Sequence, residues 1–186
     1  KMHLVPFGEY VPLRSVLFFV DKLATGIGDF APGEFRTLFR LPRGTFAASI
    51  CFEVIFPAEV RAAVADGAEF LVNITNDAWF GRSAAPAQHL RMAAFRALET
   101  RRYLARAANT GISALVDPYG RILASTHLFE EAVLVRGLTP RRDLTPYVRF
   151  GDWFAAAASL AAGGWVASAW AAERRAARGG RVAWRN

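Results

Sequence analysis

The feature that most restricts the fold is a run of 20 residues without a charged side chain, from Trp153 to Ala172. A helix of that length crosses a hydrocarbon core of about 30 Å. Tyr147, Trp153 and Trp170 lie near its ends, where interfacial aromatic residues are typical. We therefore expect a transmembrane helix over 153–172. A buried helix of a soluble protein is the alternative, because the run is rich in alanine and only mildly hydrophobic.

The charge of the chain is concentrated behind this run. The tail 173–186 contains five arginines and one glutamate, so it carries more than half of the net charge of +7. By the positive-inside rule this tail lies in the cytoplasm, which places the residues ahead of the run on the outer side of the membrane. Those residues are nearly balanced in charge and contain no nucleic-acid-binding motif, so we do not expect a nucleic-acid partner.

The residues ahead of the run alternate between strand-like and helix-like segments. We expect strands over 37–41, 45–50, 69–75, 112–116, 121–124 and 132–136, and helices over 13–23, 57–66 and 86–107. This alternation predicts a layered α/β domain. The strand 69–75 is apolar enough to be buried on both faces. The expected division is a domain over 1–142, a juxtamembrane lead-in over 143–152, the span over 153–172 and the basic tail over 173–186.

The only cysteine of the chain, Cys51, lies where an apolar strand gives way to a helix that begins at Pro57. A nucleophile on a strand-to-helix turn is lifted out of the sheet, and nearby backbone N–H groups can receive developing negative charge. A single cysteine cannot form an internal disulfide, and a free thiol outside the cytoplasm is expected to have a function. Cys51 is therefore the candidate nucleophile.

Charged residues that could activate this thiol lie nearby in the sequence. A thiol with a pKa of about 8.5 reacts poorly at neutral pH until a cation stabilises the thiolate or a carboxylate accepts its proton. Lys1 and Glu9 flank a loop that also holds His3, Pro6 and Gly8, and Glu53 follows the cysteine by two residues. Each charge could instead be a solvated surface group, but the specific composition of the loop favours a role for Lys1.

Three segments resemble, in the right order, the conserved motifs of one enzyme family. Residues 1–12 resemble the lysine motif of apolipoprotein N-acyltransferases, residues 50–57 their cysteine motif, and residues 76–99 their third conserved block. Residues 144–147, ahead of a final span, also fit. This resemblance covers nearly the whole chain. It implies a nitrilase-like α-β-β-α sandwich, present here only in part, followed by one C-terminal transmembrane helix.

The resemblance also implies roles for individual residues. Cys51 would be the nucleophile of a Glu–Lys–Cys triad, and Lys1 the triad lysine that stabilises the thiolate and the oxyanion. Glu9 would support the lysine, Glu53 would be a supporting acid, and the backbone N–H of Phe52 would complete the oxyanion hole. In this family the triad glutamate lies upstream of the lysine. We therefore expect the sequence to be the C-terminal part of a longer protein and to be inactive alone.

The implied reaction is the last step of lipoprotein maturation. Cys51 would take an acyl chain from a phospholipid as a thioester, and the free α-amine of a diacylglyceryl-cysteine at an apolipoprotein N-terminus would then receive it. The membrane is part of this reaction, and the implied location is the bacterial inner membrane with the catalytic domain on the periplasmic side. No cofactor is implied. No metal is expected either, since His3, His89 and His127 lack ligand spacing.

Substrate-binding residues are expected on the loop after the strand 69–75. Trp79 and Phe80 would form an apolar wall for the acyl chain or lipid, although both could simply cap the core. Asn73 and Asn76 near the strand end would orient the site, or would only satisfy the loop backbone.

Two other functions fit part of the sequence. A nitrilase-type amidase would use the same triad with water as the acceptor, but a soluble amidase needs no span followed by arginines. A non-catalytic, membrane-anchored interaction domain would bury Cys51 in its core. The lysine loop and the cysteine turn together in one chain argue against that second alternative.

Overall fold

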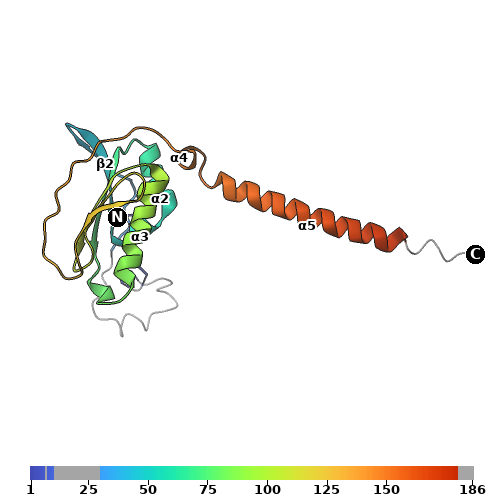
Figure 1. Ribbon diagram of the computed structural model, residues 1–186, viewed down its shortest axis with the longest axis horizontal. Helices are drawn as coiled ribbons and strands as arrows, with labels where there is room; N and C mark the ends of the chain where they lie inside the picture. Colours follow the sequence, from blue (N-terminus) through green and yellow to red (C-terminus); the bar gives the residue numbers. More distant parts are fainter. Residues whose placement is uncertain (7, 11–29, 180–186) are drawn as a thin grey trace, which may run out of the picture. The chain divides into compact units, whose positions relative to one another are not determined.

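The computed structural model describes residues 1–6, 8–10 and 30–179, and the predicted helix over 13–23 lies outside these residues (Figure 1). The chain divides into two compact units, Lys1–Arg149 and Phe150–Asn186. Within its described residues, the first unit contains one six-stranded sheet with helices. The second contains one long helix.

The strands of the sheet lie side by side in the order in which they occur along the chain. They are β1 (Leu38–Leu41), β2 (Gly44–Ile50), β3 (Phe70–Asn76), β4 (Leu104–Asn109), β5 (Ala114–Val116) and β6 (Ile122–Ser125). β2, β3 and β4 are parallel, and the outer pairs are antiparallel. The layered α/β domain that the alternation predicted is confirmed, with a mixed sheet.

Two helices connect the parallel strands. α2 (Pro57–Ala65) leads from β2 to β3, and α3 (Ala85–Thr100) leads from β3 to β4. Because both crossovers are right-handed and advance in the same direction, both helices lie on the same face of the sheet (Figure 1). The core forms between this face and the helices from the buried side chains Val60, Ala63, Val64, Leu71, Leu90, Ala93, Ala97 and Leu104.

The prediction that β3 is buried on both faces is wrong for this chain. Its side chains alternate, as the pleat requires, so that Leu71, Asn73 and Thr75 are buried toward the helices while Ile74 is 47% exposed. We call the other side the open face, formed by Phe39, Phe46, Ala48, Ile50, Phe70, Val72 and Ile74. Three of its rings stack across the strands, with centroids 4.9 Å apart for Phe39 and Phe46 and 5.4 Å apart for Phe46 and Phe70.

The helix predicted over 86–107 is too long. α3 ends at Thr100, Arg101 adopts a left-handed conformation (φ 54°), and the chain then enters β4 beside β3. The alanines and arginines of this segment favour a helix, but pairing with a buried parallel strand overrides that preference. The strand predicted over 132–136 is also absent, and Val133 and Val135 are largely exposed.

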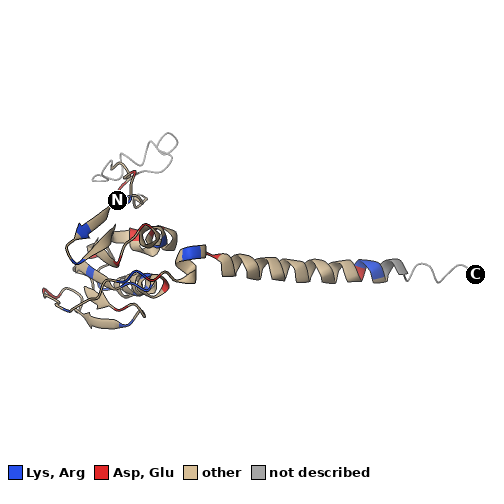
Figure 2. Cartoon of the chain, turned by 90° about the horizontal axis from the view of Figure 1, so that it is seen from above, with Lys and Arg blue, Asp and Glu red and all other residues tan. Residues whose placement is uncertain are grey.

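The second unit confirms the helix expected over 153–172. α4 (Pro146–Phe150) precedes it, and α5 runs over Trp153–Gly179. In the described part of the chain, α5 is the one helix long and apolar enough to cross a membrane, by length and composition, over Trp153–Ala176. Figure 2 shows that its charged residues are confined to the C-terminal turns.

Candidate active site

Cys51 lies on the predicted strand-to-helix turn, which is confirmed. β2 ends at Ile50, a short 3-10 helix η1 (Cys51–Ile55) follows, and α2 begins at Pro57. Cys51 is a free thiol, half-buried, with φ of 56°. A non-glycine residue rarely adopts this left-handed conformation, which has a conformational cost of about 1–3 kcal/mol and occurs often at functional sites.

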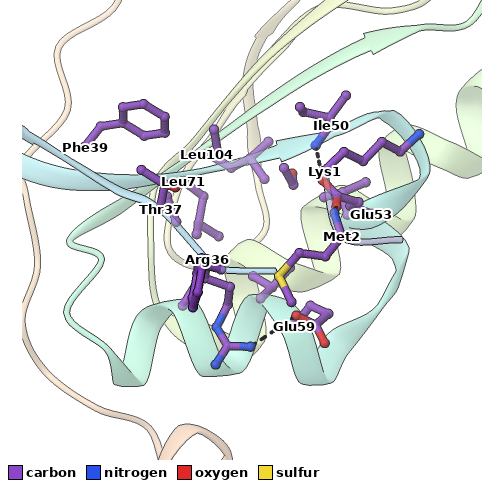
Figure 3. Close-up of a pocket in the computed structure, with 17 residues that line it drawn as sticks. Lys1, Met2, Arg36, Thr37, Phe39, Ile50, Glu53, Glu59, Leu71 and Leu104 are labelled. Carbon is purple, nitrogen blue, oxygen red and sulfur yellow. Dashed lines mark hydrogen bonds and ion pairs between the residues drawn. The ribbon is translucent and has the colours of Figure 1, made fainter. Parts of the chain in front are cut away.

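Glu53 joins the Cys51 turn to the N-terminal loop. One of its carboxylate oxygens accepts the Ile50 N–H at 2.7 Å, and the other accepts the N–H groups of Met2 and His3, the latter at 3.2 Å. The side chain is buried. Figure 3 shows the result: Lys1 and Met2 lie beside Ile50 and Glu53, although the two segments are about fifty residues apart in the sequence.

Lys1 is held by Glu9. Its Nζ donates to both carboxylate oxygens of Glu9 at 2.6 Å, and the Lys1 side chain is only 10% exposed. The Val5 N–H donates to the same carboxylate at 2.8 Å. Burial opposes ionisation of Glu9, but the hydrogen bonds from Lys1 and Val5 outweigh it, so the pKa of Glu9 lies below its ordinary value. Glu9 is therefore a fixed negative charge that positions the lysine.

Aromatic contacts provide a second link between the loop that begins at Lys1 and the Cys51 turn. The His3 ring stacks on Phe56 with centroids 4.4 Å apart, and Phe52 meets Phe56 edge to face at 4.9 Å. The Phe52 ring is thus packed against Phe56, while the Phe52 backbone N–H comes directly after Cys51. The role of His3 in fastening the loop was not predicted, since a lone histidine in a loop carries no specific sequence signal.

An apolar cavity of about 160 Å³ lies beside the lysine loop. Lys1, Met2, Ile50 and Glu53 line one end of it, and the Arg36–Glu59 ion pair (3.3 Å) also belongs to its lining (Figure 3). Its walls are mostly small or aliphatic side chains, among them Ala47, Val54, Val60, Ala63, Leu71 and Leu104. Cys51 is outside this lining.

The three expected substrate-binding residues do not line this cavity: Asn76 ends β3, and Trp79 and Phe80 follow that strand. Trp79 is 83% exposed, Phe80 meets the His89 ring edge to face at 6.1 Å, and Asn76 Oδ1 accepts the Ala78 N–H at 3.1 Å. They lie nevertheless at the same edge of the sheet as Cys51, because the parallel strands β2 and β3 both end there.

A buried polar cluster lies behind the Cys51 turn, and only Asn73 of its members was expected to orient the site. It consists of Asn73, Thr75, Asp77, His89 and Arg106. Arg106 escaped notice because its segment was predicted to be helical, whereas strand alternation with Leu104 would have placed it inside. Among the described residues, no group of three or more His, Cys, Asp or Glu side chains is arranged to hold a metal ion.

Comparison with known proteins places these motifs in a family. The sequence model of the carbon–nitrogen hydrolase family matches residues 1–144. The apolipoprotein N-acyltransferase of Geobacter metallireducens is 52% identical over 155 residues, covering 83% of this chain and 30% of that protein. The enzyme of the same name from Azotobacter vinelandii is 43% identical over 178 residues, covering 95% of this chain and 34% of that protein.

The chain thus spans about a third of the length of the curated relatives that it matches. Among solved structures, the NitN amidase from Nesterenkonia sp. AN1 is 24% identical with a TM-score of 0.49, over 81% of this chain and 52% of that one. The resemblance predicted from the three motifs is confirmed by the relatives.

Proposed function

The chain belongs to the carbon–nitrogen hydrolase family, and from this premise we propose that it is the C-terminal part of an apolipoprotein N-acyltransferase. The observation that carries the proposal is the double fastening of the lysine loop to the cysteine turn. Glu53 binds backbone N–H groups of both segments, and Glu9 holds the Lys1 ammonium. These contacts bring the segment that carries the Lys1 ammonium to the turn that carries the Cys51 thiol, and a cation near a thiol stabilises its thiolate.

In the first half-reaction the Cys51 sulfur attacks the ester carbonyl of a phospholipid acyl chain. The thiol proton passes to a glutamate carboxylate, which we place in the part of the protein that precedes Lys1. The oxyanion is stabilised by Lys1 and by the Phe52 N–H. As the carbon–oxygen bond breaks, the leaving oxygen takes the proton, lysophospholipid departs, and the acyl group remains as a thioester on Cys51.

In the second half-reaction the α-amine of a diacylglyceryl-cysteine attacks this thioester. A carbon–nitrogen bond forms, the carbon–sulfur bond breaks, and the amine proton returns through the glutamate to the Cys51 sulfur. The products are an amide-linked, triacylated lipoprotein and the free enzyme. Glu53 remains a positioning residue throughout, since backbone N–H groups occupy both of its oxygens.

The acyl chain needs an apolar surface near the thiol. Trp79 and Phe80, at the same edge of the sheet as Cys51, supply it in this proposal, with Asn76 holding the loop that carries them. The large exposure of Trp79 suits a side chain that meets lipid.

The location follows from α5. We place residues 153–172 of α5 across the bacterial inner membrane, residues 1–142 on the periplasmic side, and the arginine-rich tail 173–186 in the cytoplasm. A cysteine introduced after Arg178, in a protein that carries Cys51→Ala, should react with an impermeant thiol reagent only from the cytoplasmic side. Labelling from the periplasmic side would contradict this orientation.

The chemistry is tested on the full-length protein in membranes, with a phospholipid labelled in its acyl chain. A hydroxylamine-sensitive labelled adduct should form on the protein and fall to background in Cys51→Ala. The matched control is Cys51→Ser, in which any adduct is an oxygen ester that resists neutral hydroxylamine. A sensitive adduct that persists in Cys51→Ala would refute the proposal.

The acceptor decides between acyl transfer and amidase chemistry. With a diacylated lipopeptide present, the label should move from Cys51 to the lipopeptide amine. Release of the label as free fatty acid, at the same rate with and without lipopeptide, would instead favour a hydrolase that uses water.

A further inference from the structure

A fully buried arginine lies behind the Cys51 turn. Arg106, on β4, is 3% exposed and pairs in register with Asn73 of β3. Its guanidinium donates to Asn73 Oδ1, to Asp77 Oδ2 at 2.7 Å and to the Ile112 carbonyl at 3.2 Å. Asn73 and Asp77 are buried, and the guanidinium of Arg106 does not face solvent.

Arg106 determines which way the Asn73 amide points. Because the guanidinium donates to the amide oxygen, the amide nitrogen must face β2, and a flipped amide would set two donors against each other. In this orientation Asn73 Nδ2 donates to the Ser49 carbonyl at 3.1 Å and to the Cys51 carbonyl at 3.4 Å. The arginine therefore reaches the backbone of the Cys51 turn through the Asn73 side chain.

This hydrogen bond lies where the backbone is strained. Cys51 has φ of 56°, and such a conformation persists only when the surroundings fix it. Glu53 holds the turn at the Ile50 N–H, ahead of the strained residue, at 2.7 Å. Asn73 holds it at the Cys51 carbonyl, behind it. The two side chains fix the turn on both sides of the Cys51 Cα.

The rest of the cluster keeps the arginine in place. Asp77 Oδ1 accepts the Thr75 hydroxyl at 2.9 Å and lies 3.1 Å from His89 Nδ1. Burial alone would raise the pKa of Asp77, but the contact with His89 and the charge of Arg106 outweigh it, and this pKa lies below its ordinary value. A Cβ atom at Gly111 would come within 2.5 Å of Asp77 Oδ2, so the Gly111 loop closes tightly over the ion pair.

A purely structural core would not require this cluster. Two residues earlier on the same strands, the inward pair is Leu71 and Leu104, which is an ordinary apolar contact. Buried ion pairs are commonly no more stabilising than apolar residues of similar volume. The polar pair of Asn73 and Arg106 beside the Cys51 turn, with leucines one step farther from it, indicates that the buried charge serves the turn.

We propose that Asn73 and Arg106 are positioning residues for the nucleophile. Arg106 orients the Asn73 amide, and the amide holds the Cys51 carbonyl so that the Cys51 backbone keeps its left-handed conformation. The proposal rests on the proposed function in that it takes Cys51 to be the nucleophile. Neither side chain touches the acyl group, so their replacement should slow acylation without weakening phospholipid binding.

The main variant is Asn73→Asp in the full-length protein in membranes. It keeps the shape of the side chain and its acceptor for Arg106, but it turns an oxygen instead of an N–H toward the Ser49 and Cys51 carbonyls. We expect single-turnover acylation of Cys51 to fall at least 10-fold, with an unchanged KM for phospholipid. The matched control is Thr100→Val, which removes another buried hydrogen bond (Thr100 Oγ1 to the Arg96 carbonyl, 2.6 Å) away from the turn and should acylate within 3-fold of wild type.

A double-substitution cycle tests whether Arg106 acts through Asn73. Arg106→Lys keeps the positive charge but removes the planar guanidinium, whose separate nitrogens donate to Asn73 and to Asp77 at the same time. This substitution alone should slow acylation several-fold. In the Asn73→Asp background it should add little further loss. Independent, additive losses, a rise in KM with the maximal rate unchanged, or wild-type acylation in Asn73→Asp would each overturn the proposal. If Asn73→Asp does not fold, the acylation rate of Arg106→Lys alone tests the proposal.

Alkylation of Cys51 by iodoacetamide separates this proposal from the proposed function. If wild-type protein forms no acyl adduct, the acyltransferase function fails, and the alkylation rate still reports on the turn. Asn73→Asp and Arg106→Lys should then change that rate at least 3-fold relative to wild type, and Thr100→Val should not. Equal alkylation rates in all four proteins would overturn the positioning role by itself.

Discussion

The two faces of the sheet differ in how deeply their side chains are buried. On the face toward α2 and α3, β3 contributes Leu71, Asn73 and Thr75, all buried, and the polar members have hydrogen-bond partners within the chain. On the open face the same strand contributes Phe70, Val72 and Ile74, which are only partly buried. The described residues cover the first face, which we call the finished face, with α2 and α3, and they leave the second, open face uncovered.

The open face is apolar throughout, from the stacked Phe39, Phe46 and Phe70 to Ile74. A sheet must bury an apolar face against another layer, and large exposed apolar patches mark interaction surfaces. The α-β-β-α sandwich implied by the resemblance needs a second sheet at this position. We propose that the part of the protein outside this sequence supplies that sheet together with the triad glutamate.

The largest expected effect on stability is on the finished face. Asp77→Ala leaves Arg106 buried without its carboxylate and should lower the free energy of unfolding by about 3–5 kcal/mol. Chemical unfolding of the chain in detergent, followed by tryptophan fluorescence, measures the loss. Replacing both partners with leucine should recover much of it, because no unpaired charge then remains. A loss below about 1 kcal/mol in the single variant would contradict the buried pair.

A smaller effect compares two positions of β3. Leu71→Ala, on the finished face, should cost about 2–5 kcal/mol. Ile74→Ala, on the open face, should cost less than about 1 kcal/mol in this chain, since its side chain is already half exposed. In the full-length protein the cost of Ile74→Ala should rise toward that of Leu71→Ala. Equal costs in the isolated chain would show that the two faces do not differ.

The smallest effect appears with pH. The folded-state pKa of Asp77 lies below its ordinary value, so its stabilising contribution is complete above that ordinary value and is lost as the pH falls through the lowered one. Unfolding free energies measured from pH 6 down to pH 2 should therefore decline less steeply in Asp77→Asn than in wild type. Identical slopes would mean that Asp77 does not titrate differently in the two states.

The local elements of the site could be predicted from the sequence. An apolar strand, a lone cysteine and a proline at a helix start specify the Cys51 turn, because each signal is local. The Glu53 contacts could not be predicted, since they join residues about fifty positions apart. β4 was missed for a related reason: its composition favours a helix, and only pairing with β3 makes it a strand.

The sequence by itself determined most of the elements other than β4, the turn that carries Cys51 and the apolar helix of the last forty residues, because hydrophobic periodicity and turn residues act over short distances. Only the tertiary structure decided that Glu53 fastens the lysine loop to this turn and that Arg106 reaches it through Asn73. It alone also decided that one face of the sheet is finished and the other is not. Burial and hydrogen-bond satisfaction depend on which distant segments meet, and no local pattern encodes that.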